Sequence, residues 1–108
     1  MKRVIIYVRG ESEELQEIIC RVYAANKGYK VVRTTRYIED VHDIEANDCD
    51  ALLVASYSRI SRNKIDYLKI LNELKEEGVE LISVANQDDA DKSISLAIDL
   101  FGGIKNLL

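Results

Sequence analysis

Short apolar runs alternate along this chain with segments of helical periodicity. The first run, Val4–Val8, is almost entirely apolar and β-branched, which is typical of a strand covered on both faces. Similar runs at Tyr29–Thr34, Ala51–Ala55 and Val79–Val84 predict three more strands. Because strands that alternate with helices pair in parallel, we expect a three-layer α/β/α fold with a mostly parallel four-stranded sheet. Val4–Val8 should be its centre.

The segments between these strands predict helices. Over residues 12–27 apolar side chains recur at i, i+3, i+4 and i+7, acidic residues occupy the first turn, and Gly28 follows the end. Three-residue spacing of apolar positions in residues 38–44 indicates a short second helix. Residues 63–77 predict a third helix, which Gly78 ends.

The last segment, residues 89–108, is apolar on more than one side. One predicted stripe contains Ile94, Ala97, Phe101 and Ile104, and another contains Leu96, Leu100 and Leu107. One stripe can cover the sheet while the other remains exposed, which favours a partner. We therefore expect a homo-oligomer that forms through this C-terminal helix.

Composition limits the classes of function. A chain of 108 residues is one domain, and its net charge of -4 repels nucleic acid at long range, so DNA binding would need a local basic patch. Cys20 and Cys49 have no metal-site spacing and His42 stands alone, so we expect reduced thiols and no metal or cofactor.

No segment of the sequence is apolar over enough consecutive residues to span a membrane. We expect a cytoplasmic protein.

The arginines are the strongest chemical signal. Arg9 closes the first predicted strand, Arg33 and Arg36 close the second, and Arg59 and Arg62 follow the third. The carboxyl edge of such a sheet is where ligands bind, and guanidinium groups suit a phosphate. Two guanidinium groups about 6 Å apart repel by roughly 3 kcal/mol at an effective dielectric constant of about 20, so the cluster predicts an anion.

Other phosphate-binding α/β folds do not fit. The sequence has no Gly-x4-Gly-Lys-Ser/Thr loop and no Gly-x-Gly-x-x-Gly after the first strand. Receiver-type domains need acidic residues after the first strand and an aspartate at the end of the third, where this chain has Arg9 and Ala55.

Three motifs in order carry a family resemblance. Tyr7-Val8-Arg9 is similar to Tyr-x-Arg-x-Ser. Gln16, Cys20, Tyr23, Ala24, Gly28 and Tyr29 match the pattern Gln-x3-Cys-x2-Tyr-Ala-x3-Gly-Tyr. Ser58-Arg59-Ile60-Ser61-Arg62 looks like Asp-Arg-Leu-Ser-Arg. Together these segments span nearly the whole chain, which resembles the catalytic domain of the serine recombinases, the resolvase and invertase family.

The resemblance implies a fold, a partner and a chemistry. In that family a serine attacks a DNA phosphodiester to form a phosphoserine link, arginines stabilise the charge on phosphorus, and no metal is needed. It implies a catalytic set of Ser12, Arg9, Arg59 and Arg62, and phosphate contacts from Arg9, Arg36, Arg59 and Arg62, with Arg33 an alternative to Arg36. We expect one resolvase-like domain over residues 1–108, without a separate DNA-binding domain.

Departures from the family pattern leave catalysis open. Glu11 stands at the nucleophile position, Ser12 lies one residue late, and Ser58 replaces the family's aspartate. A carboxylate beside a phosphodiester repels it. We therefore expect a site-specific DNA recombinase domain that is divergent or catalytically impaired. The alternative is a non-enzymatic interaction module whose arginine edge binds phosphate or a nucleic-acid backbone.

Structural roles compete with these assignments. Ser12 precedes a helix and suits its N-cap, a role worth about 1 kcal/mol on replacement by Ala. Arg62 could pair with Asp66 one turn later, and Arg9 could pair with Glu11 or Glu13.

Overall fold

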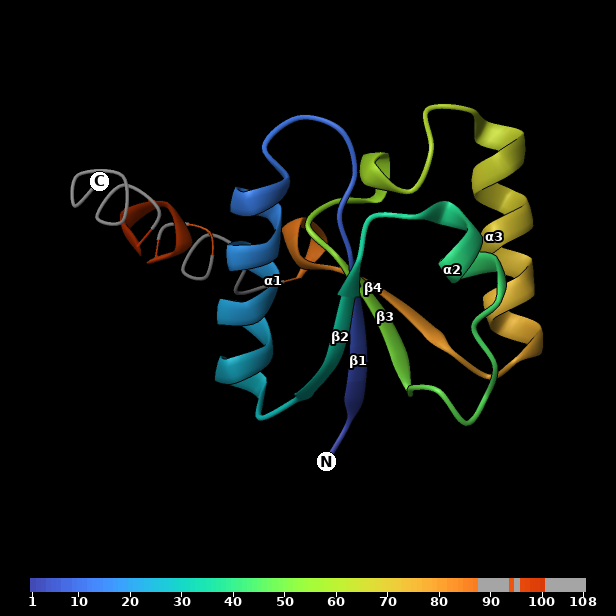
Figure 1. Ribbon diagram of the computed structural model, residues 1–108, viewed down its shortest axis with the longest axis horizontal. Helices are drawn as coiled ribbons and strands as arrows, with labels where there is room; N and C mark the ends of the chain where they lie inside the picture. Colours follow the sequence, from blue (N-terminus) through green and yellow to red (C-terminus); the bar gives the residue numbers. More distant parts are fainter. Residues whose placement is uncertain (88–93, 95, 101–108) are drawn as a thin grey trace.

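Four parallel strands form the centre of the molecule in the computed structural model, which describes residues 1–87, 94 and 96–100 (Figure 1). The strands are β1 (Arg3–Tyr7), β2 (Lys30–Thr35), β3 (Ala51–Val54) and β4 (Glu80–Ser83), and the helices are α1 (Glu13–Lys27), α2 (Ile38–His42) and α3 (Lys64–Glu76). Two 3-10 turns, η1 (Tyr57–Arg59) and η2 (Val84–Asn86), follow β3 and β4. The predicted alternation of strand and helix is confirmed.

The sheet order is β2-β1-β3-β4, and all three pairings are parallel. The prediction that the first strand is central is confirmed, because β1 pairs with both β2 and β3. After β1 the chain runs outward to β2, and then returns past β1 to β3. The carboxyl ends of β1 and β3 therefore form a topological switch point, the usual place for a ligand in such sheets.

Strict alternation of side chains builds a core on each face of the sheet. Successive residues of a strand point to opposite faces, so an apolar run is needed where both faces are covered. One core, beside α1, contains Val4, Ile6, Val8, Cys20, Tyr23, Ala24, Ala51, Leu53, Ala55, Ile82 and Val84. The other, beside α2 and α3, contains Ile5, Tyr7, Val41, Ile44, Cys49, Leu52, Val54, Ile60, Ile70, Leu74 and Val79. Figure 1 shows these helices on opposite sides of the sheet.

Glycine and asparagine set the helix ends. Gly28 follows α1 with φ of 73°, and Gly78 follows α3 with φ of 71°, a left-handed conformation that suits glycine at the end of a helix. α3 begins at Asn63, whose Oδ1 accepts a hydrogen bond from the backbone N–H of Ile65 at 2.9 Å. Both long helices thus end where the sequence predicted.

The second strand is shifted by one residue toward the C-terminus from its predicted span. β2 continues to Thr35, because the ladder with β1 extends to the pairing of Tyr7 with Thr35. Arg33 therefore lies within the strand, opposite Ile5, and Arg36 alone follows its end. The two arginines do not share the edge as expected.

The described part of the C-terminal segment has one buried side and one exposed side. Ala97 is buried and Ile94 packs against the core beside α1. Leu96, Ile98 and Leu100 are exposed. The expectations for Phe101, Ile104 and Leu107 lie outside the described residues.

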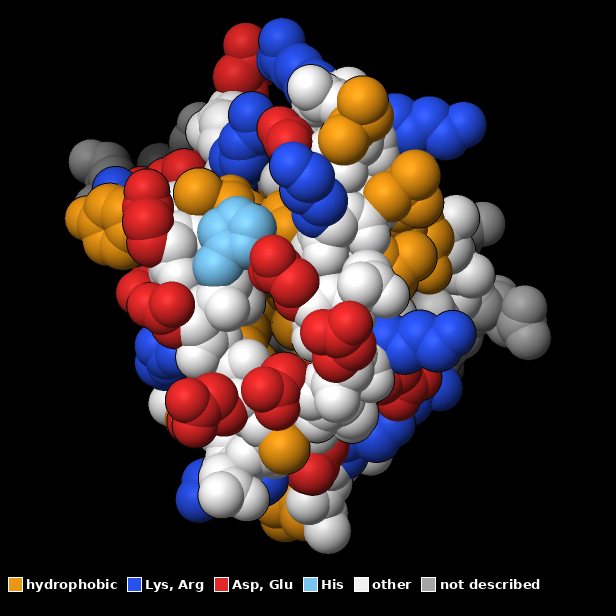
Figure 2. All heavy atoms as spheres, turned by 90° about the vertical axis from the view of Figure 1, so that its right-hand side faces the viewer, with side chains coloured by type: hydrophobic (Ala, Val, Ile, Leu, Met, Phe, Trp, Pro, Cys, Tyr) orange, Lys and Arg blue, Asp and Glu red, His pale blue; other side chains and the backbone are white. Residues whose placement is uncertain are grey.

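Charge is unevenly distributed over the face formed by α2 and α3. Figure 2 shows Lys and Arg side chains gathered above the histidine, near the carboxyl edge of the sheet, and Asp and Glu side chains below it.

Among the residues that the structure describes, no helix has the length and apolar character needed to cross a bilayer. Both cysteines are free and buried, and burial raises the pKa of Cys20 to about 12.

Candidate functional site

A buried glutamine holds the loop between β1 and α1. Gln16 is 2% exposed, and its Oε1 accepts a hydrogen bond from the backbone N–H of Arg9 at 3.0 Å. Its Nε2 donates to the carbonyl oxygens of Arg9 at 2.8 Å and Glu11 at 2.7 Å. A polar residue within the buried stripe of α1 therefore satisfies three backbone groups of the loop that carries Arg9, Glu11 and Ser12.

Arg9 and Arg59 meet at the switch point. The alternation that buries Tyr7 on the α3 side of the sheet continues to Arg9, whose side chain lines a cavity on that side. Nη1 of Arg59 donates to the carbonyl oxygen of Arg9 at 3.4 Å, and a Cβ on Gly10 would lie 3.5 Å from the same Nη1. The turn η1 thus places one guanidinium over the β1–α1 loop.

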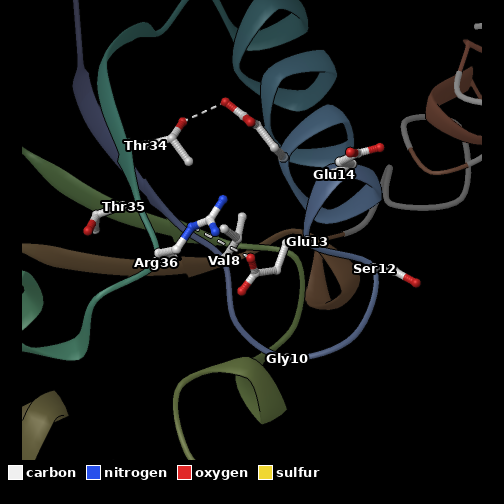
Figure 3. A pocket seen from close by; sticks show the side chains of 9 residues that line it. Val8, Gly10, Ser12, Glu13, Glu14, Thr34, Thr35 and Arg36 are labelled. Atoms are coloured by element: carbon white, nitrogen blue, oxygen red, sulfur yellow. Dashed lines mark hydrogen bonds and ion pairs between the residues drawn. The ribbon is translucent and has the colours of Figure 1, made fainter.

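Arg36 lies apart from these two arginines, beside α1. It helps to line a cavity of about 670 Å³, with Val8, Gly10, Ser12, Glu13, Glu14, Glu17, Thr34 and Thr35. Its Nε lies 3.7 Å from Oε1 of Glu13, across the mouth of the cavity (Figure 3). Three carboxylates against one guanidinium make this cavity acidic. An anion would enter it only against repulsion.

The turn that carries Arg36 has its own support. Thr35 is buried, and its Oγ1 donates to Oδ2 of Asp40 and accepts from the backbone N–H of Tyr37 at 3.2 Å. Beside it, Oε2 of Glu17 accepts a hydrogen bond from Thr34 at 2.8 Å. Burial alone would raise the pKa of Glu17, but hydrogen bonds from Thr34 and Arg21 outweigh it and lower the pKa.

Ser12 occupies the N-cap position of α1 in an unusual conformation. Its φ of 59° and ψ of 43° are left-handed, which costs a non-glycine residue about 1 kcal/mol. Its carbonyl oxygen accepts from the backbone N–H of Gln16 at 3.0 Å, but its hydroxyl makes no capping hydrogen bond. Figure 3 shows the hydroxyl pointing away from Arg36. The predicted capping role is thus met by the backbone and not by the side chain.

Arg62 and Arg33 stand outside the arrangement of Arg9 and Arg59. Arg62 is exposed in the turn before α3, and within the described residues it forms no ion pair with Asp66, the competing structural role, and no hydrogen bond. Ser61 in the same turn accepts from the backbone N–H of Asn63 at 3.0 Å. The arginines therefore do not form one cluster: Arg36 lies beside α1, Arg9 lines the cavity beside α3, and Arg59 contacts the backbone of Arg9.

Metal-ligating residues do not gather in the described part of the chain. No group of three or more His, Cys, Asp or Glu side chains there has the geometry to hold a metal ion. His42 is instead engaged by Glu73, with 2.7 Å between Nδ1 and Oε2.

Comparison with known proteins places this arrangement in a family. The family described as "Resolvase, N terminal domain" matches residues 4–107. The chain therefore belongs to the resolvase family. The resemblance carried by its three motifs is confirmed.

Several solved structures share the fold of this chain. The C-terminal catalytic domain of ISC1926 TnpA, an IS607-like serine recombinase, has a TM-score of 0.67 at 22% identity, over 97% of this chain and 82% of that one. The N-terminal catalytic domain of TP901-1 integrase gives 0.65 at 19% identity, over 98% of both chains. A resolvase family site-specific recombinase from Streptococcus pneumoniae gives 0.65 at 19% identity, over 99% of this chain and 92% of that one. No curated protein sequence matches the chain.

Replacing Gln16 tests the loop clamp. Gln16→Leu keeps a similar volume but leaves three backbone groups of the β1–α1 loop without a partner, so the free energy of unfolding should fall by about 3 kcal/mol. Urea unfolding followed by circular dichroism measures this. Asn26→Leu, at an exposed polar position of the same helix, should change it by less than about 0.5 kcal/mol. Equal losses in the two variants would contradict the clamp.

Proposed function

We propose that this resolvase-type domain binds the DNA backbone through its arginine edge and that strand cleavage through Ser12 is severely impaired. The proposed phosphate contacts are Arg9, Arg36, Arg59 and Arg62, and the proposed catalytic set is Ser12, Arg9, Arg59 and Arg62. The contact between Arg59 and the carbonyl of Arg9 carries the proposal, because it places the Arg59 guanidinium against the backbone of Arg9 at the switch point of the sheet.

Electrostatics explain why binding must be local. The chain as a whole is anionic, so a DNA strand is attracted only where cations outnumber carboxylates. Arg9 and Arg59 provide such a place, since neither forms an ion pair with a carboxylate within the described chain. Arg36 forms an ion pair with Glu13, and this pair would have to break before Arg36 could contact a phosphate.

Cleavage would require Ser12 to lose its hydroxyl proton, form a bond to phosphorus and displace a DNA oxygen, which takes up a proton. Negative charge then grows on the phosphoryl oxygens, and arginines must lie close to them. Around Ser12 stand Glu11, Glu13 and Glu14 instead, and the hydroxyl points away from Arg36. The nearby carboxylates oppose both the approach of the phosphate and the transition state.

The alternative remains a non-enzymatic interaction module with the same phosphate-binding edge. Glu11 at the family's nucleophile position favours it. The two candidate functions differ in one observable result, since only an impaired enzyme forms a covalent protein–DNA adduct that depends on a serine hydroxyl.

We further propose a cytoplasmic location, with which the two free cysteines are consistent.

Phosphate binding is tested by Arg59→Gln. Loss of one charged contact should weaken binding of a fluorescent DNA duplex at low salt about tenfold and reduce the slope of log affinity against log salt by about one. Fluorescence anisotropy measures both quantities. Arg21→Gln removes an exposed arginine that is paired with Glu17 away from the edge and should leave binding unchanged. Equal effects of the two variants would show non-specific attraction and contradict the proposal.

Cleavage is tested by covalent trapping on a nicked suicide duplex. The unmodified chain should give only a trace of protein–DNA adduct, and Ser12→Gly, which suits the left-handed backbone, should give none. Glu11→Ser should increase the adduct, because it removes a charge and supplies a hydroxyl at the family's position. Abundant adduct from the unmodified chain would overturn the impairment, and adduct that persists in Ser12→Gly would overturn the role of Ser12.

Self-association is proposed through the exposed side of the C-terminal segment. Leu96, Ile98 and Leu100 are exposed while Ala97 is buried, so an apolar surface faces outward. Leu100→Glu should move the sedimentation coefficient toward that of a monomer across a hundredfold range of concentration. Leu68→Glu, at an exposed leucine of α3, should not. A monomer at every concentration of the unmodified chain would exclude the proposal.

A further inference from the structure

The turn after β3 exposes an aromatic ring at the carboxyl edge of the sheet. Tyr57 begins η1, the same short turn that carries Arg59, and it is 37% exposed. Single exposed apolar residues are common on protein surfaces and need no explanation by themselves. This ring differs from them because it stands two residues from a proposed phosphate contact. Its support, its charge environment and its direction therefore decide whether it has a function.

Tyr67 supports the Tyr57 ring from below. The two rings meet edge to face, with 6.1 Å between their centroids and 76° between their planes, a geometry that aromatic pairs prefer. Tyr67 in turn packs against the core beside α3. An edge-to-face contact covers at most one face of a ring. Tyr57 is therefore held in place by the core and still has ring surface open to solvent.

The segment around Tyr57 is locally cationic, although the chain as a whole is anionic. Residues 56–65 contain Arg59, Arg62 and Lys64 and no Asp or Glu, while the net charge of the chain is -4. In proteins that bind single-stranded nucleic acid, cations follow the backbone and aromatic rings stack on the bases. An exposed ring within a basic segment that lacks carboxylates has the same composition.

Tyr37 provides a comparison at the same edge. It is also exposed and follows Arg36. Arg36, however, is paired with Glu13, and two acidic residues occupy the first turn of the helix that begins after Tyr37. These carboxylates repel a DNA backbone. Exposure alone therefore does not make a nucleic-acid contact, and the two tyrosines differ in their charge environment.

The turn directs Tyr57 and Arg59 to different places. A 3-10 turn has three residues per turn, so side chains two positions apart point about 120° away from each other. Arg59 reaches back to the carbonyl oxygen of Arg9, while Tyr57 reaches the α3 side of the edge, where Tyr67 lies. The side chain of Arg9 lies on that side as well. A strand whose phosphate contacts the two arginines would thus bring an adjoining base to the exposed ring.

We propose that Tyr57 stacks on an unpaired base of the DNA strand whose phosphate Arg9 and Arg59 hold. This inference rests on the proposed function. Every base has an aromatic face, so the contact does not depend on base identity. In an intact duplex the neighbouring base pairs cover both faces of each base. Only a single strand, a nick or a frayed end supplies the contact, and the domain gains affinity for DNA that is locally opened.

Two strands that differ only in their bases isolate the stacking contact. A fluorescent oligothymidylate and an abasic strand of equal length carry the same phosphates. In fluorescence anisotropy the unmodified chain should bind the oligothymidylate about tenfold more tightly. Tyr57→Leu should remove this difference by weakening only the strand with bases, and Tyr57→Phe, which keeps the ring, should retain it. Equal affinities for the unmodified chain, or equal weakening of both strands in Tyr57→Leu, would overturn the inference.

Two further variants assign the effect. Tyr37→Leu is the matched control and should leave both affinities unchanged, so an effect equal to that of Tyr57→Leu would overturn the assignment to Tyr57. Arg59→Gln should weaken both strands by the same factor, because it removes a phosphate contact. Normal binding of both strands by Arg59→Gln would contradict the phosphate site. Normal binding of the oligothymidylate by Tyr57→Leu would contradict the stacking contact alone.

Photo-crosslinking of the unmodified chain locates the base without any variant. Under near-ultraviolet light a 5-iodouracil base joins covalently to a tyrosine ring on which it is stacked, with loss of hydrogen iodide. Mass spectrometry of the digested adduct then identifies the residue, which should be Tyr57. A strand that binds without forming this adduct, or that forms it at Tyr37 instead, would overturn the inference.

Discussion

The hydrogen bonds of one buried side-chain amide hold the candidate site together. Gln16 makes three hydrogen bonds to the β1–α1 loop, and through them α1 determines where Arg9 and Glu11 lie. Arg59 then docks on the carbonyl of Arg9 and brings the turn after β3 to the same place. Without the amide, three backbone groups of the loop would lose their partners, and the loop that carries Arg9 and supports Arg59 would lose its attachment to α1.

Charge divides the carboxyl edge of the sheet into two unlike halves. Carboxylates from the first turns of α1 surround Ser12 and engage Arg36, while Arg9 faces the other side of the sheet, beside α3. Acidic residues at a helix N-terminus are favoured by its dipole, so the fold gains from the same charges that oppose phosphate chemistry. This conflict is the physical basis of our proposal that the domain keeps a phosphate-binding arginine edge while cleavage through Ser12 is impaired.

The fold followed from the sequence because its determinants are local. Continuous apolar strands, Gly28 and Gly78 predicted the layers, the central strand and the helix ends, and the structure agrees. The candidate site could be predicted from the sequence only in part. Sequence could place arginines after strands, but not on one side or the other of the sheet, because a shift of one residue reverses the side chain. The role of Gln16 was signalled only by a polar residue in a buried stripe.

The central claim is that Arg9 and Arg59 together hold a DNA phosphate. The most direct measurement is a crystal structure of the chain with a short DNA strand. We predict a backbone phosphate within hydrogen-bond distance of both guanidinium groups, with the β1–α1 loop unmoved and still held by Gln16. DNA bound elsewhere, with Arg59 still resting on the Arg9 carbonyl and no phosphate beside it, would contradict this account.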